Sequence, residues 1–578
     1  QKTAYERGVR LVGSEMCIRD RAWGLAGDEA RRSGRLEVAA ERYRKGLEVK
    51  PEDLPLTLGL AQVELANGRL ETARETIDKV LAVAAKDLTA VLLAAELDLA
   101  QRQQDAARKR LDEVRAAKPT HPMHKAQLAL LSGRLLELSS DSAGALALYR
   151  EAITSAGEAD LAPTMAAVSL LTHLADQSKD EAEAAAQRAE VEALLLPLTK
   201  RASQDSSVAV TLGAAYLAAG NATKAEEWLT AAVAQRPDDL DARLQLAKAA
   251  RKLGRLQQAI ELLQAGFTTA PTRADLGTEL ASTMEEAGRI KDAGALYERL
   301  LALEGASIGL RAHAGRFLAR MGEIEQAAKQ GAEILAQVPE GDAAGYFLRG
   351  LGALHAGKLE DARRDLSRAV NLDRDPEYLD ALGKATEALG SATGDSRFKE
   401  EALRVYAQAV ELRPSVSSLL GLGRLRLERR EPPKALEALL QANQLDPRER
   451  EVLYLVGIAY QELRQFKAAA AWYSRANEIK AGAETDYRLG LAYIELEQAA
   501  QAATALGRAT AAALADERRG DAKVPWLTEA LYQLGRIESD RRNDAAARRA
   551  WETYLARSPA STPQAEEVKR MLMSLRGR

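Results

Sequence analysis

Five histidines and one cysteine are the residues that could supply metal ligands or a catalytic nucleophile. Only His121 and His124, in the segment THPMHK, lie close together in the sequence. A zinc site needs three or four ligands, and neither a cysteine nor an H-E-x-x-H pattern accompanies this pair. We therefore predict that the two histidines belong to a turn and that the chain holds no metal.

Motifs of the common catalytic machineries are also absent. The sequence contains neither a G-x-x-x-x-G-K-[ST] phosphate-binding loop nor a G-x-S-x-G nucleophile elbow. Its 84 acidic residues offer many carboxylates, but no spacing singles out a pair for acid–base chemistry. We predict a protein that is not an enzyme, with no catalytic residue and no cofactor.

The charge balance excludes two further classes of partner. Lys and Arg number 81 against 84 Asp and Glu, which gives a net charge of −3. Nucleic-acid-binding proteins usually carry a basic excess, so we expect no nucleic-acid partner. Charged residues make up 29% of the chain and interrupt every apolar run before it reaches the ~18 residues of a membrane span.

Residues 1–21 differ in character from the rest of the chain. The segment QKTAYERGVRLVGSEMCIRDR lacks periodicity and resembles a translated sequencing-adapter remnant. We therefore exclude it from the fold, together with the single cysteine, Cys17. The natural N-terminus is then expected to be missing. The localisation stays open, with the periplasm or cell envelope favoured over the cytoplasm.

A repeat of about 34 residues fills the remainder. It is marked by an alanine that precedes an apolar run, and most intervals between these alanines are 33 to 35 residues. The interval of 80 between Ala145 and Ala225 has room for two repeats, one of them degenerate and centred on residues 180–196. About fifteen repeats are predicted. The marking alanines are Ala39, Ala73, Ala107, Ala145, Ala225, Ala259, Ala293, Ala327, Ala362, Ala402, Ala435, Ala469, Ala502 and Ala547.

Two other positions test the period independently. Twelve residues before the alanine, ten of the fourteen repeats have glycine, where 40 glycines in 578 residues predict about one by chance. Twelve residues after it, eight of the fourteen have proline, although the chain holds only 17 prolines. These positions include Gly213, Gly390 and Gly457, and Pro237 and Pro447.

The residue types explain what each repeat builds. Within 213–237, GAAYLAAGNATKAEEWLTAAVAQRP, apolar residues recur at intervals of three and four, which predicts two amphipathic helices broken at Gly220 and Asn221. The small side chains of Gly213 and Ala225 allow the two helices to cross closely. Pro237 ends the second helix because proline lacks an N–H group and clashes with the preceding turn.

This pattern resembles the tetratricopeptide repeat (TPR) family. The first repeat has Trp23, Gly27, Gly34, Ala39, Tyr43 and Pro51 at the characteristic positions, and a later one has Gly457, Tyr460, Ala469, Tyr473 and Ala476. The resemblance implies an all-α fold, a right-handed superhelical solenoid of stacked antiparallel helix hairpins, and the binding of proteins or peptides.

Departures from the period predict the domain organisation. We expect N-terminal repeats over 22–155, degenerate helical repeats over 156–205, central repeats over 206–390 and C-terminal repeats over 391–510. The segment SATGDSRFK, at 391–399, is expected to lengthen a turn. A solvated linker is expected over 511–527. The last repeat and a capping helix, which begins at Thr562 and Pro563, are expected over 528–578.

The family resemblance also predicts where a partner binds. First helices of stacked hairpins line a concave groove. Family ligands usually contact positions 2, 5, 9, 12 and 13 of these helices, numbered so that the recurring Gly or Ala is position 8. Tyrosine occupies position 5 in three successive repeats, and tyrosine is frequent in interaction hot spots. The alternative is that these tyrosines pack against neighbouring first helices. The predicted groove residues are Tyr454, Ile458, Tyr487, Leu491, Tyr532 and Arg536, and upstream Phe347, Leu351, Leu420 and Arg424.

Charged residues of an earlier pair of repeats are expected to bind each other. Lys248, Arg251 and Lys252 face the next repeat, which carries Glu285 and Glu286. Asparagine never occupies position 9, so the family's Lys/Asn/Arg clamp for chaperone C-termini is not expected.

The leading functional hypothesis is a non-catalytic scaffold that assembles a larger bacterial complex, such as one for envelope export, secretion or motility. One alternative is the regulatory part of a multidomain enzyme or sensor whose N-terminal part is missing. Another is polysaccharide binding, with Tyr454, Tyr487 and Tyr532 as stacking platforms. The partner's identity and the oligomeric state stay open.

Overall fold

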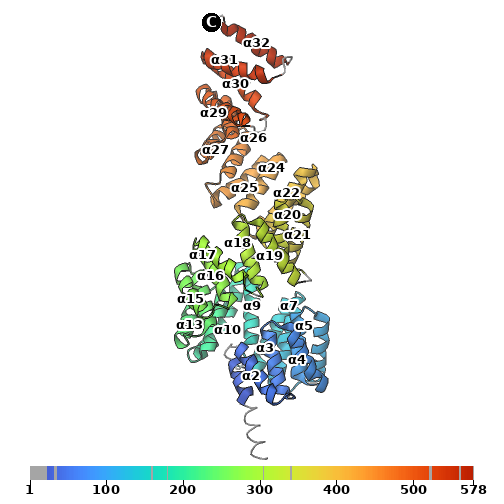
Figure 1. The fold of residues 1–578 in the computed structure, drawn as a ribbon. Coiled ribbons are helices and arrows are strands. Elements are labelled where there is room, and N and C mark those ends of the chain that lie inside the picture. Colours follow the sequence, from blue (N-terminus) through green and yellow to red (C-terminus); the bar gives the residue numbers. More distant parts are fainter. Residues whose placement is uncertain are drawn as a thin grey trace, which may run out of the picture. The chain divides into compact units, whose positions relative to one another are not determined.

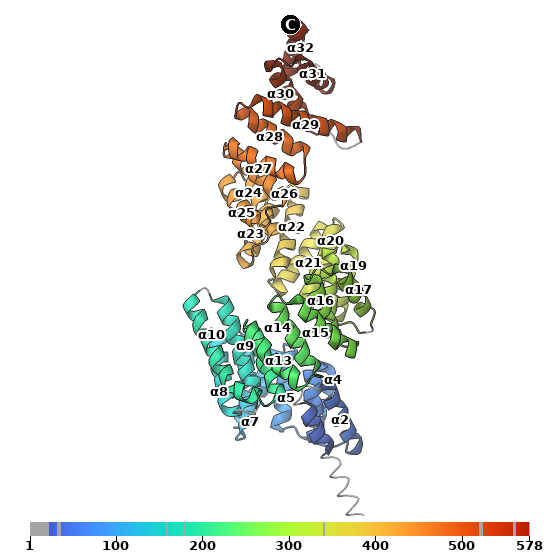
Figure 2. The same ribbon diagram turned by 90° about the vertical axis from the view of Figure 1, so that its left-hand side faces the viewer.

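The computed structural model describes residues 22–31, 36–157, 160–178, 180–303, 305–338, 341–519, 524–558 and 562–576. The predictions for residues 1–21 and Cys17 lie outside the described residues. The chain divides into two compact units, Gln1–Leu300 and Leu301–Arg578, called unit 1 and unit 2 below. Figures 1 and 2 show the helices of each.

Unit 1 is built of helices throughout its described residues. Residues 22–31 are helical, and a short 3₁₀-helix, η1 (Leu196–Leu198), precedes α11. The α-helices are α2 (Leu36–Val49), α3 (Leu54–Ala66), α4 (Leu70–Val83), α5 (Leu88–Ala100), α6 (Gln104–Ala116), α7 (Pro122–Leu138), α8 (Ser142–Ala156), α9 (Ala162–Gln177), α10 (Glu181–Leu195), α11 (Thr199–Ala202), α12 (Ser206–Ala218), α13 (Ala222–Gln235), α14 (Leu240–Lys252), α15 (Leu256–Thr269), α16 (Ala274–Glu286) and α17 (Ile290–Leu301).

Unit 2 continues the same architecture, and no strand occurs in the described part of either unit. The predicted all-α fold of stacked helix hairpins is therefore confirmed. The helices of unit 2 are α18 (Ile308–Arg320), α19 (Ile324–Gln337), α20 (Ala343–His355), α21 (Leu359–Leu372), α22 (Pro376–Thr393), α23 (Ser396–Leu412), α24 (Val416–Glu428), α25 (Pro432–Leu445), α26 (Arg450–Glu462), α27 (Phe466–Ile479), α28 (Ala483–Glu495), α29 (Ala499–Arg518), α30 (Leu527–Asp540), α31 (Asp544–Arg557) and α32 (Pro563–Arg576).

The hairpin α12–α13 shows why small residues recur. A Cβ atom added to Gly213 would lie 2.5 Å from Cγ of Leu229, so only glycine permits this approach of the two helices. Ala225 and Leu229 are fully buried in the hairpin. Gly220 has φ +78°, and the Asn221 side chain accepts a hydrogen bond from the backbone N–H of Lys224, which caps α13. Counted over the described residues there are fifteen hairpins, as predicted.

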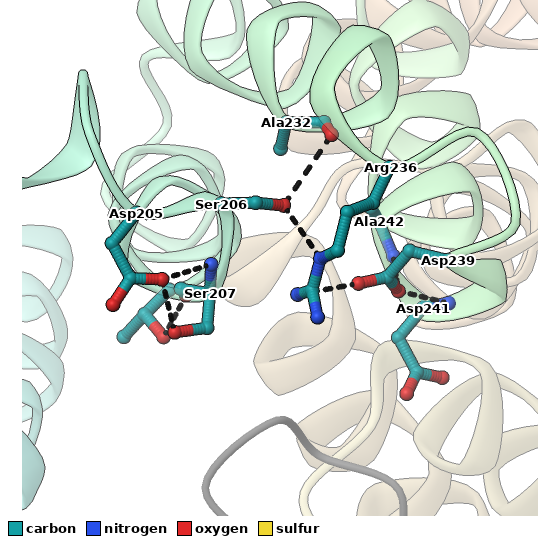
Figure 3. A network of polar contacts seen from close by, with 9 residues as sticks. Asp205, Ser206, Ser207, Ala232, Arg236, Asp239, Asp241 and Ala242 are labelled. Carbon is teal, nitrogen blue, oxygen red and sulfur yellow. Dashed lines mark hydrogen bonds and ion pairs between the residues drawn. The ribbon is translucent and has the colours of Figure 1, made fainter.

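The turn that ends the second helix α13 also begins the next hairpin. Helix α13 ends at Gln235, two residues before Pro237. Figure 3 shows how Arg236 then donates a hydrogen bond from Nε to the Ser206 hydroxyl (3.1 Å) and pairs with Asp239 (2.9 Å). Asp239 caps α14 by accepting from the backbone N–H of Ala242. The turn thus joins α12, α13 and α14.

The hairpin α22–α23 differs from its prediction. Residues 391–399 were expected to lengthen a turn, but α22 and α23 have 18 and 17 residues and the turn stays short. Gly394, with φ +72°, ends α22, and the Asp395 side chain caps α23. The 40-residue interval exceeds the usual one by about two helical turns. The insertion therefore lengthens both helices by about whole turns, so the same sides of the two helices stay packed against each other.

The segment after the fourteenth hairpin also departs from the expected linker. Residues 511–518 continue α29, and Ala513 is fully buried. Trp526 packs, partly buried, against the last hydrophobic cluster. The capping helix α32 begins as predicted, with Leu575 buried and Met571 and Leu572 packed against the same cluster. Residues 156–205, expected to be degenerate, contain α9, α10, η1 and α11.

Candidate functional site

First helices contact each other directly along the stack. In unit 2, α20 contacts α22, α22 contacts α24, and α24 contacts α26, while in unit 1 α12 contacts α14. Helices α24, α26 and α28 carry six of the ten predicted groove residues, and all six are partly exposed; Arg424, the charged one, is described separately below. We call the partly exposed residues Leu420, Tyr454, Ile458, Tyr487 and Leu491 the first-helix face.

Tyr454 connects two consecutive first helices. Its hydroxyl donates a hydrogen bond of 2.6 Å to Oε1 of Glu484 and accepts one of 2.8 Å from Nε of Arg488. Both partners belong to α28, the next first helix. The Tyr454 ring also lies 6.0 Å from that of Tyr473, centroid to centroid. Burial, followed by the hydrogen bond to Glu484, raises the pKa of Tyr454.

The other two tyrosines, Tyr487 and Tyr532, also contact residues that come later in the chain. Tyr487 stacks on Trp526, with ring centroids 4.7 Å apart and planes inclined by 10°. Tyr532 is only 7% exposed, and its hydroxyl donates to Oε2 of Glu567 on α32 at 3.1 Å. Each of the three tyrosines therefore contacts the element that follows its hairpin. This is the packing role that the sequence left as the alternative to partner binding.

Apolar residues of the first-helix face are less constrained. Leu420, Ile458 and Leu491 are partly exposed. Ile458 packs against the hydrophobic clusters on both sides of it, and Leu420 packs against one of these. Arg536 is exposed, and its guanidinium lies 5.9 Å from the centre of the Tyr532 ring.

Arg424 belongs to a partly buried polar network. It donates from Nε and Nη2 to the two carboxylate oxygens of Glu387, at 2.8 and 3.0 Å. Its Nη1 atom donates to Glu451 at 3.0 Å. The hydrogen bonds that Arg424 donates to the Glu387 carboxylate hold the pKa of Arg424 above its usual value. The structure thus gives Arg424 a role in joining α22, α24 and α26.

The upstream residues Phe347 and Leu351 lie in a separate cluster. Phe347 is 2% exposed, and its ring lies 4.7 Å from that of Tyr378. The Arg316 guanidinium lies over both rings, 5.9 Å from the first and 5.2 Å from the second, and donates to the Tyr378 hydroxyl. Leu351 is partly buried beside this cluster. Phe347 and Leu351 are therefore not continuous with the aromatic residues of α26 and α28.

Sequence reasoning missed the residues that engage the tyrosines. Arg488, Glu484 and Trp526 were not among the predicted site residues. Position 2 of the last three first helices is glutamate in every case, at Glu451, Glu484 and Glu529, and this recurrence was the available signal. Trp526 lies in the inserted segment, where the repeat offers no positional reference.

The remaining polar predictions concern unit 1. Arg251 pairs with Glu286 at 2.5 Å, as predicted, and also with Glu279 at 2.7 Å. His121 caps α7, and the His124 ring is hydrogen-bonded to Thr89. In the part of the chain that the structure describes, no three His, Cys, Asp or Glu side chains converge as metal ligands.

Membrane spans were searched over the same described ranges. None of the helices there combines the length and the apolar character needed to cross a lipid bilayer.

Three solved structures are similar to this chain at low sequence identity. A crystal structure of the APC/C hetero-tetramer Cut9-Hcn1 is 18% identical with a TM-score of 0.48, and the match covers 96% of each chain. A tetratricopeptide repeat protein from Parabacteroides merdae is 16% identical with a TM-score of 0.36, covering 44% of this chain and 99% of that one. The MamA protein is 22% identical with a TM-score of 0.28, covering 32% and 98%. No curated protein sequence matches the chain.

Family models identify the repeat in both units. Models described as tetratricopeptide repeat match residues 30–91 and 216–278 in unit 1, and residues 387–449 and 420–484 in unit 2. Each matched segment consists of the helix hairpins described above, with a small residue at the crossing. The chain is a tetratricopeptide repeat protein.

Proposed function

We propose that the chain is a non-catalytic scaffold that holds a peptide or protein partner on the first-helix face of unit 2 and so assembles a larger complex. The supporting observation is that α24, α26 and α28 present partly exposed tyrosine and aliphatic residues at the same repeat positions. Proteins with these repeats generally act through protein partners. A surface with recurring apolar positions suits an elongated partner.

Within this proposal the residues have two roles. Tyr454 and Tyr487 are held by Arg488 and Trp526, so they give the face a rigid surface rather than freely moving side chains. Ile458 and Leu491 have no hydrogen-bonding function and remain partly exposed, so they are the contact residues we propose for the partner.

The contacts of the tyrosines weigh against polysaccharide binding. One face of the Tyr487 ring is covered by Trp526, and the Tyr454 hydroxyl is already shared between Glu484 and Arg488. Stacking on a sugar requires a free ring face. The protein-scaffold function is therefore preferred, in a bacterial assembly such as an export, secretion or motility complex. A regulatory role within a longer enzyme or sensor would use the same face.

Paired aliphatic substitutions test the proposal. The variant I458S/L491S removes apolar contact area from the face, and L445S/I479S is its matched control. Leu445 and Ile479 are 52% and 46% exposed at the ends of the second helices α25 and α27. In pull-downs from a native extract, the first variant should lose partners that the control retains. An unchanged set of partners would contradict the proposed face.

A further inference from the structure

Arg316 on α18 contacts residues that lie two hairpins further along the chain. Its Nη2 atom donates hydrogen bonds to the Tyr378 hydroxyl at 2.7 Å and to Asp375 at 3.2 Å, which are 62 and 59 residues away in the sequence. The first helix between them, α20, contacts both α18 and α22. The Arg316 side chain therefore crosses α20, where its guanidinium lies 5.9 Å from the centre of the Phe347 ring.

The residues around this guanidinium have the chemistry of an arginine-binding site. Phe347 and Tyr378 are buried, and the guanidinium lies over both rings. Asp375 and Glu377, at the N-terminal end of α22, supply two partly exposed carboxylates. Aromatic rings for stacking and carboxylates for pairing suit the planar guanidinium better than an ammonium group. We call these four residues the arginine pocket.

Arg316 fits the arginine pocket less well than a neighbouring arginine fits its own carboxylate. Arg349 donates two hydrogen bonds to Asp365, at 2.7 and 3.0 Å, which is the strong bidentate arrangement. Arg316 donates a single hydrogen bond to a carboxylate, that of Asp375. Glu377 lies 3.6 Å from Nε of Arg316, and this buried nitrogen has no hydrogen-bond partner. The pocket therefore has pairing capacity that Arg316 does not use.

We propose that the arginine pocket binds an arginine side chain of a partner protein, and that Arg316 fills the pocket when this partner is absent. The exchange of one guanidinium for another keeps the two rings covered and the carboxylates paired, so neither charge is left buried alone. The incoming arginine approaches from the solvent side, where both carboxylates are partly exposed and bidentate pairing is open to it. The site lies on α20 and α22, apart from the first-helix face, and so goes beyond the proposed function.

The probe is a short synthetic peptide with a single arginine among glycines and serines. Two reference peptides carry lysine or the neutral isostere citrulline in its place. Binding to the full chain is measured by fluorescence anisotropy at constant ionic strength. R316A removes the internal competitor, so it should bind the arginine peptide about tenfold more tightly than the unsubstituted chain does. The lysine and citrulline peptides should show no such gain.

Two further variants locate the binding. R316A/D375N/E377Q removes both carboxylates, and the asparagine can still cap α22 as Asp375 does. This variant should lose the gain shown by R316A. R475A is the matched control, because Arg475 is an exposed arginine 4.3 Å from the centre of the Trp472 ring and pairs with no carboxylate among the described residues. Equal gains in R316A and R475A would overturn the inference.

A lysine substitution keeps the inference testable if R316A loses its fold. R316K retains a positive charge beside the carboxylates, but an ammonium group neither stacks as a plane nor pairs bidentately. R316K should therefore also bind the arginine peptide more tightly than the unsubstituted chain. Circular dichroism, together with hydrogen exchange in α18–α22, establishes that each variant is folded. A folded R316A or R316K that gains no affinity would refute the pocket.

The two proposals can fail separately. If I458S/L491S keeps every native partner while R316A gains affinity for the arginine peptide, the first-helix face is refuted and the arginine pocket stands. If adding I458S/L491S to R316A abolishes the gain, the peptide is bound on the first-helix face and the arginine pocket is refuted.

Discussion

The hydroxyl of Tyr406 on α23 donates a hydrogen bond of 2.9 Å to Oε2 of Glu387 on α22, inside the hairpin that the two helices form. The Tyr406 ring lies between two glycines, and a Cβ atom added to either Gly383 or Gly421 would come within 2.5 Å of it. Glu387 also accepts two hydrogen bonds from Arg424 of the next hairpin. One buried carboxylate therefore connects consecutive repeats.

Substitutions in this pair should differ in cost. Y406F removes one hydrogen bond while Glu387 keeps its arginine, so we expect a loss of about 1 kcal/mol. E387A leaves the Tyr406 hydroxyl without its acceptor and leaves the Arg424 guanidinium with Glu451 alone, and we expect a loss of about 3 kcal/mol. Urea unfolding gives the total, and hydrogen exchange in α22–α24 locates it, because long repeat arrays need not unfold in one step. An E387A variant as stable as Y406F would contradict this role.

Glycine-to-alanine substitutions should have opposite signs at two positions. G383A places a methyl group against the Tyr406 ring and should destabilise the hairpin by about 1–3 kcal/mol. G507A, in α29, meets no atom within 4 Å and should stabilise the chain by about 0.5–1 kcal/mol, because alanine favours the helix. Thermal and urea unfolding of the two variants provide the measurement. A destabilised G507A would show that the space beside α29 is not free.

The repeat could be predicted from sequence because sterics at each helix crossing restrict the residue type. Counting residues nevertheless misplaced one crossing. Gly390 stands twelve residues before Ala402, as the period requires, yet Gly383 is the glycine that contacts Tyr406. The extra residues extend α22 and α23 on both sides of their turn. Composition does not distinguish two added helical turns from a longer loop.

The candidate site was predictable in position but not in contacts. The period places Tyr454 and Tyr487 at the same place in successive first helices. The residues that contact these two tyrosines lie outside their own hairpins. Arg488, which contacts Tyr454, belongs to the next repeat, and Trp526, which stacks on Tyr487, belongs to an insertion that has no counterpart in the other repeats. Pairings between repeats depend on side-chain length and direction, and the spacing of glycines and prolines carries no information about either.

Asp98 should be the most sensitive acidic residue of unit 1. It is 1% exposed and accepts hydrogen bonds from Arg74 at 2.7 Å and from Arg110 at 2.8 Å, so it joins α4, α5 and α6. D98A leaves two guanidinium groups without their shared acceptor, and we expect a loss of about 3 kcal/mol. D112A is the control, because Asp112 pairs with Arg115 at the exposed surface. This substitution should lower the free energy of unfolding by less than about 0.5 kcal/mol. Equal melting temperatures for the two variants would refute the prediction.

Alkaline pH should unfold the hairpins through their buried tyrosines. Burial, reinforced by hydrogen bonds to acidic neighbours, raises the pKa of Tyr43 to about 12 and raises the pKa of Tyr149 and Tyr406 as well. A folded-state pKa above the unfolded value of about 10 means that the neutral phenol is favoured in the fold. Its contribution to stability is complete below pH ~10 and is lost as the pH rises through the folded-state pKa.

Circular dichroism and phenolate absorbance, recorded together against pH, test this expectation. The buried tyrosines should ionise only as helix content falls, whereas the urea-unfolded chain should titrate all 15 tyrosines near pH 10. Y149F removes one of these buried ionisable groups. Relative to its own value at neutral pH, the variant's free energy of unfolding should therefore fall less with rising pH than that of the unsubstituted chain. Ionisation of every tyrosine near pH 10 with the helices intact would show that burial does not hold these phenols neutral.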